Sequence, residues 1–343
     1  MNYKLSNIGI VVLNFNGKIL LEKFLPDLIK YSSKSNIYII DNNSTDNSLS
    51  MLKKDFKKIN VIELNKNYGY SKGYNEGMKD IDDEIICLIN NDVKVFPNWI
   101  DPIVDFYNKN DKVAILQPHI LSLKNKEKFE YAGAAGGYID KLGYPFCKGR
   151  LFNYLENDNK QYDNNYEVFW SSGACFFIKN KIFKSLKGFD EDFFAHQEEI
   201  DLCWRAKIKG NQVWSIYKSK VYHLGGGTIQ YNHPKKTYLN HRNNLFMLIK
   251  NLPDTNFINV LLKRLFYDYL TFFWYLLNLK PKHSIAIIRA HLSMIFSYNK
   301  MKRKRLPENN LHNYFTINNL PYNYFIKGLK KYTDLKVNKN NFR

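Results

Sequence analysis

A regular alternation of apolar runs and amphipathic segments over the first 120 residues constrains the fold of this chain most strongly. Short apolar runs typical of buried strands occur at 8–13, 37–40, 60–64 and 84–90. The segments between them carry apolar residues at helical spacing. Strand, helix and strand repeated in this order predict an α/β fold, with a mainly parallel sheet flanked by helices.

Each of the four predicted strands is followed by a polar segment rich in Asn, Asp and Gly. In chain order these segments read NFNG, DNNSTD, NKNYGYSKG and NNDV. Ligands of open parallel sheets bind at the carboxyl ends of the strands. We therefore expect the four segments to meet at one edge of the sheet and to form a binding site.

An acidic but partly apolar stretch, GFDEDFFAHQEEIDLCWR, occupies residues 188–205. It holds six Asp or Glu residues and one Arg, in a chain with 51 Lys and Arg against 32 Asp and Glu. From Glu198 its apolar residues have helical spacing, and Gly210 ends the predicted helix. A carboxylate in a partly apolar pocket has a raised pKa, which suits it to act as a general base.

The last part of the chain, 251–343, differs in composition from the rest. It carries 16 Lys and Arg against 4 Asp and Glu, and so accounts for +12 of the net charge of +19. It is also rich in aromatic residues, as in FINVLLKRLFYDYLTFFWYLLNL. We expect 1–250 to form the main domain and 251–343 a basic, aromatic-rich helical extension.

Cysteine usage and the N-terminal sequence indicate a cytoplasmic protein. The four cysteines are scattered without a CxxC pair, so we expect buried reduced thiols rather than disulfides or a zinc site. The N-terminal apolar run is short and interrupted by Asn, unlike a signal peptide. No apolar window is long and uncharged enough to span a membrane.

Six segments, taken in order, resemble the motifs of family 2 glycosyltransferases with the GT-A fold. They are VVLNFNG, IIDNNSTDNS, NKNYGYSKGYNEG, LINNDV, the stretch from SGACFF to RAKIKG, and VYHLGGGT. The resemblance covers about 8–250 and is greatest to the rhamnosyltransferase-like branch that builds bacterial surface polysaccharides. It implies a Rossmann-like nucleotide-diphospho-sugar transferase fold, with a donor half at about 1–120 and an acceptor half at about 121–250.

The resemblance also implies a reaction. It is an inverting transfer of a hexosyl or rhamnosyl group from a UDP-, dTDP- or GDP-sugar to a saccharide acceptor. By analogy the acceptor is a polyprenyl-diphosphate-linked oligosaccharide in O-antigen, capsule or exopolysaccharide synthesis.

The donor would lie against the strand ends. By resemblance Asp41 accepts a hydrogen bond from the donor base, with capping of the next helix as the alternative role. Phe15 would pack on the base, with core packing as the alternative. The NYGYSKG loop would contact the donor through Asn67, Gly69, Lys72 and Gly73, with a plain turn as the alternative.

A divalent cation, Mg²⁺ or Mn²⁺, would neutralise the leaving diphosphate. By resemblance the Asn90-Asn91-Asp92 segment occupies the DxD-type position of the family, so only Asp92 offers a carboxylate, an oxygen ligand for a hard cation. Asn91 can add amide contacts to the donor. The resemblance makes His223 a further metal ligand, with a structural histidine as the alternative.

The acidic pair that begins the helix at 198 is Glu198-Glu199, where the family usually has Glu-Asp. By position Glu199 matches the general base, but the longer side chain leaves the choice between Glu199 and Glu198 open. Asp190 would shape the acceptor loop, and Arg242 could clamp a phosphate of donor or acceptor. Trp170 could stack on a sugar ring or belong to the core.

Two other classes of protein remain open. A different nucleotide-using enzyme, such as a nucleotidyltransferase, would share the sheet and Asp92 but would give the acidic helix no role. The high net charge would suit a nucleic-acid-binding protein, but no such motif occurs and the charge concentrates in 251–343. We therefore expect no nucleic acid partner.

The extension is expected to attach the enzyme peripherally to the anionic inner face of the cell membrane. Its charged residues make a buried span costly, whereas its aromatic residues suit the head-group level. The KMKRKR segment at 300–305 adds five basic residues that an anionic leaflet would attract. The alternative is that these helices pad the catalytic domain or form a dimer interface.

Overall fold

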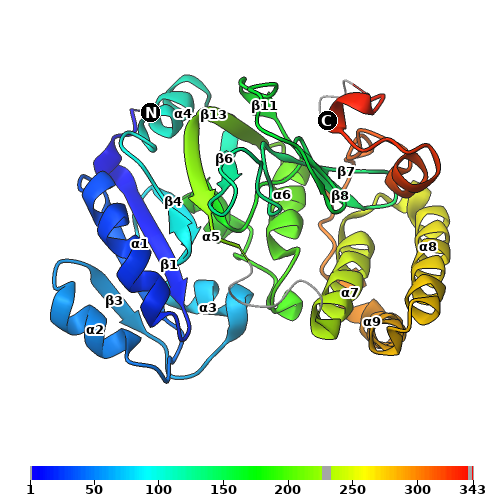
Figure 1. Cartoon of the computed structure of the whole chain (residues 1–343), viewed down its shortest axis with the longest axis horizontal. Coiled ribbons are helices and arrows are strands. Elements are labelled where there is room, and N and C mark those ends of the chain that lie inside the picture. The colour runs from blue at the N-terminus through cyan, green and yellow to red at the C-terminus, as the bar shows by residue number, and fades with distance from the viewer. Residues whose placement is uncertain (1, 226–232, 339–341, 343) are drawn as a thin grey trace.

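The computed structural model describes residues 2–225, 233–338 and 342. A nine-stranded sheet with its covering helices forms one side of the molecule, and the long helices α7 to α9 form the other (Figure 1). The strand order is β11-β13-β6-β12-β4-β1-β2-β3, and β5 pairs with β13.

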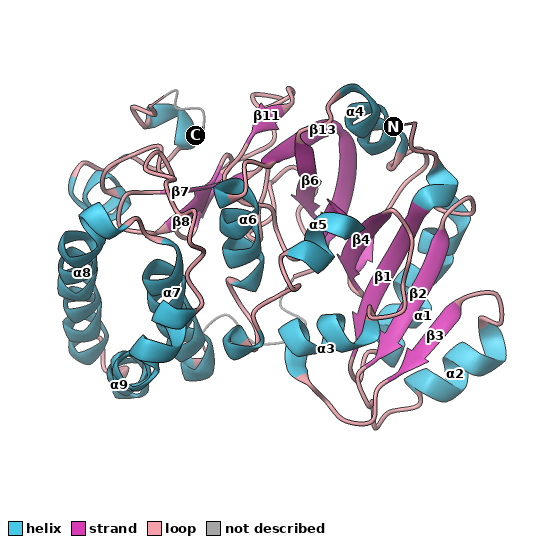
Figure 2. Ribbon diagram, turned by 180° about the vertical axis from the view of Figure 1, so that it is seen from behind, coloured by secondary structure: helices cyan, strands magenta, loops and turns pink. Residues whose placement is uncertain are grey.

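The N-terminal part of the sheet, which we predicted to be the donor half, contains the expected parallel strands. β1 pairs in parallel with β2 and β4, and β2 pairs in parallel with β3, so these strands lie together at one end of the molecule (Figure 2). The predicted α/β fold with a mainly parallel sheet is thus confirmed. The elements are β1 Ile8–Asn14, α1 Lys18–Tyr31, β2 Asn36–Asp41, α2 Ser48–Asp55, β3 Asn60–Glu63, α3 Gly69–Gly77 and β4 Ile85–Asn90.

The rest of the sheet has strands of both directions. β12 lies antiparallel between β4 and β6, and β13 runs parallel to β6. All five residues of β12 are buried, as expected for a central strand covered on both faces. The elements are β5 Val93–Lys94, α4 Asp101–Lys109, β6 Val113–Ser122, β11 Tyr166–Glu167, β12 Cys175–Lys179, α5 Asn180–Ser185, α6 Glu198–Ile208 and β13 Gln212–His223.

A second, four-stranded antiparallel sheet lies between the main sheet and the helices. Its strands are β7 Gly137–Ile139, β8 Pro145–Cys147, β9 Arg150–Leu151 and β10 Tyr154–Leu155. The C-terminal segment returns to cover this region. The ring of Tyr314 stacks on Trp204 of α6 at 5.0 Å, and Tyr332 packs against Tyr138.

The helices of the extension pack with α7, which precedes the extension, around a buried carboxylate. Asp268 is fully buried, and its oxygens lie 3.0 Å from Arg264 Nε, 3.0 Å from His241 Nδ1 and 3.2 Å from His291 Nε2. This cluster joins α7 Pro234–Asn251, α8 Phe257–Leu277 and α9 Pro281–Arg303. The short helices are η1 Leu5–Asn7, η2 Glu191–Phe193, η3 Asp254–Asn256, η4 Tyr322–Ile326 and η5 Tyr332–Asp334.

Two further expectations concern the chain as a whole. All four cysteines are buried and free, as the sequence predicted. In the part of the chain that the structure describes, no helix combines the length and apolarity that a membrane crossing requires.

Candidate active site

The polar strand ends meet around Asn14, the last residue of β1. Asn14 Nδ2 donates to Asp41 Oδ1 at 3.2 Å and to Ser48 Oγ at 3.1 Å. Asn14 Oδ1 accepts from Asn91 Nδ2 at 3.1 Å. One amide therefore joins the ends of β1, β2 and β4 at the edge where a ligand is expected.

Asp41 and Phe15 lie at this edge in different environments. Asp41 is 2% exposed, and its Oδ2 accepts a hydrogen bond from Ser44 N at 2.9 Å. It does not cap α2, because that helix begins at Ser48 after the N-cap residue Asn47. Phe15 is 46% exposed rather than packed in the core, so its ring is open to a planar group.

The predicted donor loop leads into α3. Asn67 Oδ1 accepts from Gly69 N at 2.9 Å and from Asn42 Nδ2 at 3.1 Å. Gly69 has a φ of +77°, a backbone conformation that glycine adopts without strain. Gly73 lies inside α3, where a Cβ atom would be 3.1 Å from Asn42 Nδ2. Lys72 Nζ forms an exposed ion pair with Glu191 Oε2 at 2.9 Å.

The loop that precedes α6 covers this donor loop. Phe194 O accepts hydrogen bonds from Tyr70 N at 3.0 Å and from Ser71 N at 3.3 Å. A Cβ atom on Gly69 would lie 2.6 Å from the Phe194 ring. Two segments far apart in sequence, which we predicted to contact donor and acceptor, are therefore in direct contact.

Asp92 and His223 form the candidate metal site. Asp92 follows β4 and His223 ends β13, and both are buried. His223 Nε2 lies 3.0 Å from Asp92 Oδ1. At this distance the two groups form a hydrogen-bonded ion pair, so a cation held by both would have to displace the imidazole proton.

Glu130 faces the second ring nitrogen of His223, Nδ1. Its Oε1 lies 3.4 Å from His223 Nδ1, close enough to act on the imidazole by charge, but Nδ1 is buried without a hydrogen-bond partner among the described residues. Burial lowers the pKa of His223, but the facing carboxylates of Asp92 and Glu130 outweigh it and raise that pKa to about 10.

A cation here would need further ligands. Within 2–225, 233–338 and 342, no group of three His, Cys, Asp or Glu side chains is placed to hold a metal ion. Donor phosphate oxygens and water would have to complete its coordination shell. Gly225 is described, but 226–232, which include the rest of the predicted glycine-rich loop, lie outside the described residues.

Glu198 and Glu199 begin α6, and burial raises the pKa of both carboxyl groups. Burial raises the pKa of Glu199 to about 7, although hydrogen bonds from backbone N–H groups, including those of Glu199 itself and Gly173, lower it. Glu198 is 4% exposed, and burial together with the charge of Glu199 holds its pKa well above the ordinary value. As a residue Glu199 is the less buried of the two, although Oε2 of each carboxylate is buried without a hydrogen-bond partner in the part of the chain that the structure describes.

The backbone of Gly173 and Ala174 lies between this acidic pair and the candidate metal site. A Cβ atom on Gly173 would be 3.7 Å from the Glu199 carboxyl carbon. The next residue, Ala174, accepts a hydrogen bond through its carbonyl from Asn90 N at 2.9 Å. Asn90 precedes Asp92 by two residues, so the acidic pair and the candidate metal ligands border the same region.

α7 holds the loop before the acidic pair in a strained conformation. Phe194, His196 and Gln197 all have positive φ, between 64° and 72°, which costs of order 1–3 kcal/mol per residue. Asn243 Nδ2 donates to three loop carbonyls, those of Phe193 at 3.0 Å, Ala195 at 2.8 Å and His196 at 2.6 Å. These contacts offset the strain and fix the entry to α6.

Asp190 is buried beneath this loop and is paired with cations. Its Oδ2 lies 2.6 Å from Lys250 Nζ, and its Oδ1 contacts Lys304. Burial raises the pKa of Asp190, but the two lysines outweigh it and hold that pKa well below the ordinary value. Lys300 and Lys304 also pair with Asp192, so part of the KMKRKR segment contacts the loop.

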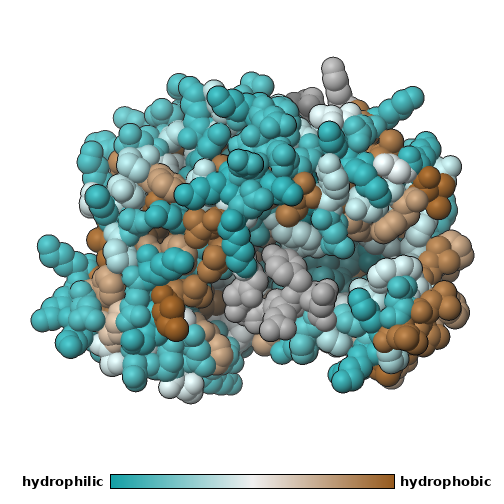
Figure 3. Space-filling view, viewed as in Figure 1, coloured by the Kyte–Doolittle hydropathy of each residue, from teal (hydrophilic) through white to brown (hydrophobic). Residues whose placement is uncertain are grey.

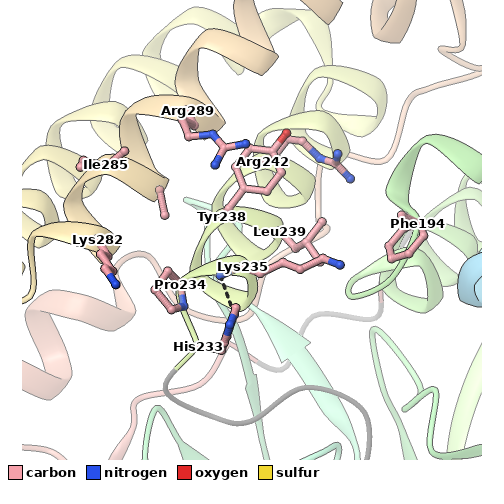
Figure 4. A pocket seen from close by; sticks show the side chains of 11 residues that line it. Phe194, His233, Pro234, Lys235, Tyr238, Leu239, Arg242, Lys282, Ile285 and Arg289 are labelled. Carbon is pink, nitrogen blue, oxygen red and sulfur yellow. Dashed lines mark hydrogen bonds between the residues drawn. The ribbon is translucent and has the colours of Figure 1, made fainter.

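Arg242 and Trp170 are both engaged by protein groups. Arg242 Nη2 donates to the carbonyls of Asp192 and Phe193 at 3.0 and 2.9 Å, and the side chain lines a hollow between α7 and α9 (Figure 4). Trp170 is 4% exposed, and its Nε1 donates to Tyr138 O at 2.8 Å. The structure thus places Trp170 in the core, and sugar stacking by this ring stays a prediction.

Sequence reasoning did not assign Asn14, Glu130, Asn243 or Lys304 to the site, and it took Lys304 only as part of the KMKRKR segment. Asn14 belongs to the NFNG segment, whose polar character at a strand end was the available signal. The contacts of the others come from residues about 50 to 115 positions away, so no local pattern reveals them.

Comparisons with known proteins identify the family and the fold. The sequence model described as Glycosyl transferase family 2 matches residues 9–187, just over half of the chain. GalNAc-T7, crystallised with UDP, GalNAc and Mn²⁺, is similar in structure, with a TM-score of 0.56 over 72% of this chain and 48% of that one at 16% identity. S. aureus TarS in complex with UDP-GlcNAc has a TM-score of 0.54 over 86% of this chain and 90% of that one at 15% identity.

Several curated proteins are similar to this chain in sequence, at 22–24% identity. The Low-salt glycan biosynthesis hexosyltransferase Agl10 of Haloferax volcanii is 22% identical over 59% of this chain and 62% of its own length. The N-acetylglucosaminyl-diphospho-decaprenol L-rhamnosyltransferase of Mycobacterium tuberculosis is 23% identical over 53% and 64%. The dTDP-rhamnosyl transferase RfbF of Shigella flexneri is 24% identical over 72% and 81%.

The match spans less than two thirds of the length of the first two relatives. The structural similarities, at 15 and 16% identity, establish the GT-A type of fold. The family match over 9–187 includes the strand ends that meet at Asn14 and the segment of Asp92. The chain therefore belongs to glycosyl transferase family 2.

Proposed function

We propose that the protein is an inverting glycosyltransferase that moves a sugar from a nucleotide-diphosphate donor to a saccharide acceptor in cell-surface polysaccharide synthesis. The observation that carries this proposal is the position of the Glu198-Glu199 pair, which borders the same region as Asp92 and His223. A nucleotidyltransferase would use the sheet edge but would leave this acidic pair without a role.

In the proposed reaction Glu199 is the general base. Its carboxylate takes the proton of an acceptor hydroxyl while the hydroxyl oxygen bonds to the anomeric carbon. The bond from that carbon to the diphosphate breaks, and the nucleoside diphosphate leaves with the electron pair. We favour Glu199 over Glu198 because Glu199 is the less buried residue and its pKa, raised by burial to about 7, suits proton transfer near neutral pH.

The donor would be held at the strand ends. Phe15 would stack on the base, Asp41 would accept a hydrogen bond from it, and Asn91 would add an amide contact. A bound Mg²⁺ or Mn²⁺ would neutralise charge on the leaving diphosphate, and Asp92 and His223 would hold it. Since two of the relatives are rhamnosyltransferases, dTDP-rhamnose is the first donor to test, before UDP- and GDP-hexoses.

A lipid-linked acceptor and a membrane surface are the proposed partners. One relative has a name that specifies a diphospho-decaprenol acceptor. On α8, Arg264 and Asp268 are buried against α7 and α9 and Lys263 is exposed, while Phe266, Phe273 and Trp274 are 54–60% exposed. Apolar surface lies over α8 at one edge of the molecule (Figure 3), which suits a peripheral position on the cytoplasmic face of a membrane.

The test is nucleotide release from dTDP-rhamnose, UDP-glucose and GDP-mannose, each with and without Mn²⁺ or Mg²⁺. We expect cation-dependent release from one class of donor. Release should fall at least about 10²-fold in Glu199→Gln, which keeps the shape of the side chain but cannot accept the proton. Absence of release with every donor, in a protein that binds none of them, would contradict the proposed function.

A further inference from the structure

A hollow of about 880 Å³ between α7 and α9 contains four cationic side chains. Lys235 and Arg242 come from α7, and Lys282 and Arg289 come from α9. No carboxylate of the described residues lies within 4.0 Å of any of the four, although Lys300 and Lys304 near the end of α9 are paired with Asp192. Four like charges around one hollow repel each other, and an anion would relieve this repulsion.

The hollow is also partly apolar. Leu239, Ile285 and Ala286 line it, and the 42%-exposed ring of Phe194 lies across from them (Figure 4). The guanidinium groups of Arg242 and Arg289 both lie near the Tyr238 ring, 5.2 and 5.4 Å from its centroid. Burial raises the pKa of the Tyr238 hydroxyl, but Ser293 and the two arginines outweigh it and lower that pKa, in keeping with a positive local field.

An exposed apolar stripe leads away from the cations along α9. Ile285, Arg289, Leu292 and Phe296 are spaced by four, three and four residues, so they lie on one face of this helix. Ile285 is 57% exposed, Leu292 48% and Phe296 84%. The charged hollow and the apolar stripe are therefore one continuous surface.

The hollow borders the loop that carries the candidate base. Phe194, on its rim, is five residues before Glu199. Gln197 Nε2 donates to Asn240 O of α7 at 3.0 Å, which joins the loop to the wall of the hollow. A ligand held by the four cations would thus have its polar end beside the loop that leads to Glu199.

We propose that this hollow binds the diphosphate of a lipid-linked acceptor, with the lipid chain along Ile285, Leu292 and Phe296 and the attached saccharide directed toward Glu199. The proposal rests on the proposed function and gives the acceptor a location in the molecule. Two features select a diphosphate lipid over a free phosphate or a neutral lipid. Four cations exceed what one phosphate needs, and the apolar stripe would have no contact with a free diphosphate.

The experiment measures binding of three probes to the full chain by calorimetry: geranylgeranyl diphosphate, geranylgeraniol and inorganic pyrophosphate, all below micelle-forming concentrations. We expect the diphosphate lipid to bind at least about tenfold more tightly than either of the others. Lys282→Ala/Arg289→Ala should weaken the diphosphate lipid at least about tenfold, since one charge-assisted contact can account for a factor of this size. Leu292→Asn/Phe296→Asn should weaken the lipid but not pyrophosphate.

A matched control removes two exposed lysines far from the hollow, Lys57→Ala/Lys58→Ala, and should bind like the wild type. Equal affinity of the Lys282→Ala/Arg289→Ala variant would overturn the proposal, as would equal binding of pyrophosphate and the diphosphate lipid. Donor hydrolysis by the wild-type chain without acceptor is measured in parallel. Failure of donor hydrolysis would count against the proposed function, whereas the probe titrations alone decide the lipid site.

Discussion

Lys304 Nζ lies 2.7 Å from Asp192 Oδ2 and also contacts the buried carboxylate of Asp190. The residue that follows the last turn of α9 is thereby joined to the loop that leads into the acidic pair at Glu198. Because this loop also contacts the start of α3 through Phe194, one segment links the helical extension to the predicted donor loop.

We predict that Lys304→Ala lowers kcat more than it raises the KM for the donor, because the loop would lose a contact that positions Glu199. Asp190 keeps Lys250 as a partner, so the free energy of unfolding should fall by only about 1–2 kcal/mol. Steady-state kinetics and urea unfolding measure the two effects. Lys304→Arg should restore most of kcat. Lys302→Ala, at an exposed neighbouring position, is the control. If kcat falls equally in Lys304→Ala and Lys302→Ala, positioning by Lys304 is ruled out.

The acidic pair predicts the pH dependence of turnover. A general base must be deprotonated to work, and burial raises the pKa of Glu199 to about 7. Activity should therefore rise with pH through about 7 and level off above it. In Glu199→Gln this rise should vanish and kcat should fall at least about 10²-fold, with donor binding retained. If Glu198→Gln instead removes the rise, the two residues exchange roles.

We predict that cation binding at Asp92 and His223 depends on donor. Asp92→Ala should abolish turnover while leaving the unfolding midpoint close to wild type in the presence of chelator. Titration of Mn²⁺ should show tight binding only with nucleotide present, because the described residues supply few ligands. Asp105→Ala, an exposed carboxylate on α4, should change neither quantity. Full activity of the Asp92 variant in chelator would disprove the assignment.

We predict that the buried charge of Asp268 stabilises the helical extension. Replacing Asp268 by Ala would leave Arg264 buried without its anion and should cost about 3–5 kcal/mol of unfolding free energy. Burial raises the pKa of Asp268, but Arg264, His241 and His291 outweigh it and hold that pKa well below 3.8. Its stabilisation is thus present above the pKa of the unfolded chain and is lost as the pH falls below it.

Thermal unfolding of Asp268→Ala between pH 3 and 7 checks both statements. The difference from wild type should be largest at neutral pH and should shrink in acid. The exposed Asp55→Ala is the control and should show a small difference at every pH. A constant difference across this range would mean that Asp268 acts through packing rather than charge.

The N-terminal part of the sheet could be predicted from the sequence almost to the residue. The strand expected at 37–40 spans Asn36–Asp41. It was predictable because its residue period and the polar residues that bound it are local signals. β6 was not predicted, although nine of its ten residues, 113–121, are buried, because Gln117, Pro118 and His119 interrupt its apolar run. The small sheet β7 to β10 has strands of two or three residues, too short for any period to appear.

The parts of the candidate site that lie within one short segment were predictable from the sequence. The parts that form only when distant segments pack together were not. The polar strand ends and the acidic pair are readable as motifs. The position of Glu130 facing His223 and the three carbonyls bound by Asn243 depend on how distant segments pack. The role expected for KMKRKR is also narrower, because three of its cations, Lys300, Lys304 and Arg305, contact protein groups, although Lys300 stays exposed together with Lys302 and Arg303.

This narrower role alters what membrane binding should look like. We predict that the full chain sediments with vesicles mainly through the exposed face of α8, so binding should persist at high salt and weaken only modestly without anionic lipid. Phe273→Ser/Trp274→Ser removes two rings that are 55% and 54% exposed and should lower the bound fraction at least about tenfold in partition coefficient. Ile19→Ser, which removes a 78%-exposed side chain from α1, should have no effect. If the double variant instead binds vesicles normally but shifts from dimer to monomer in light scattering, the face of α8 joins two copies of the chain.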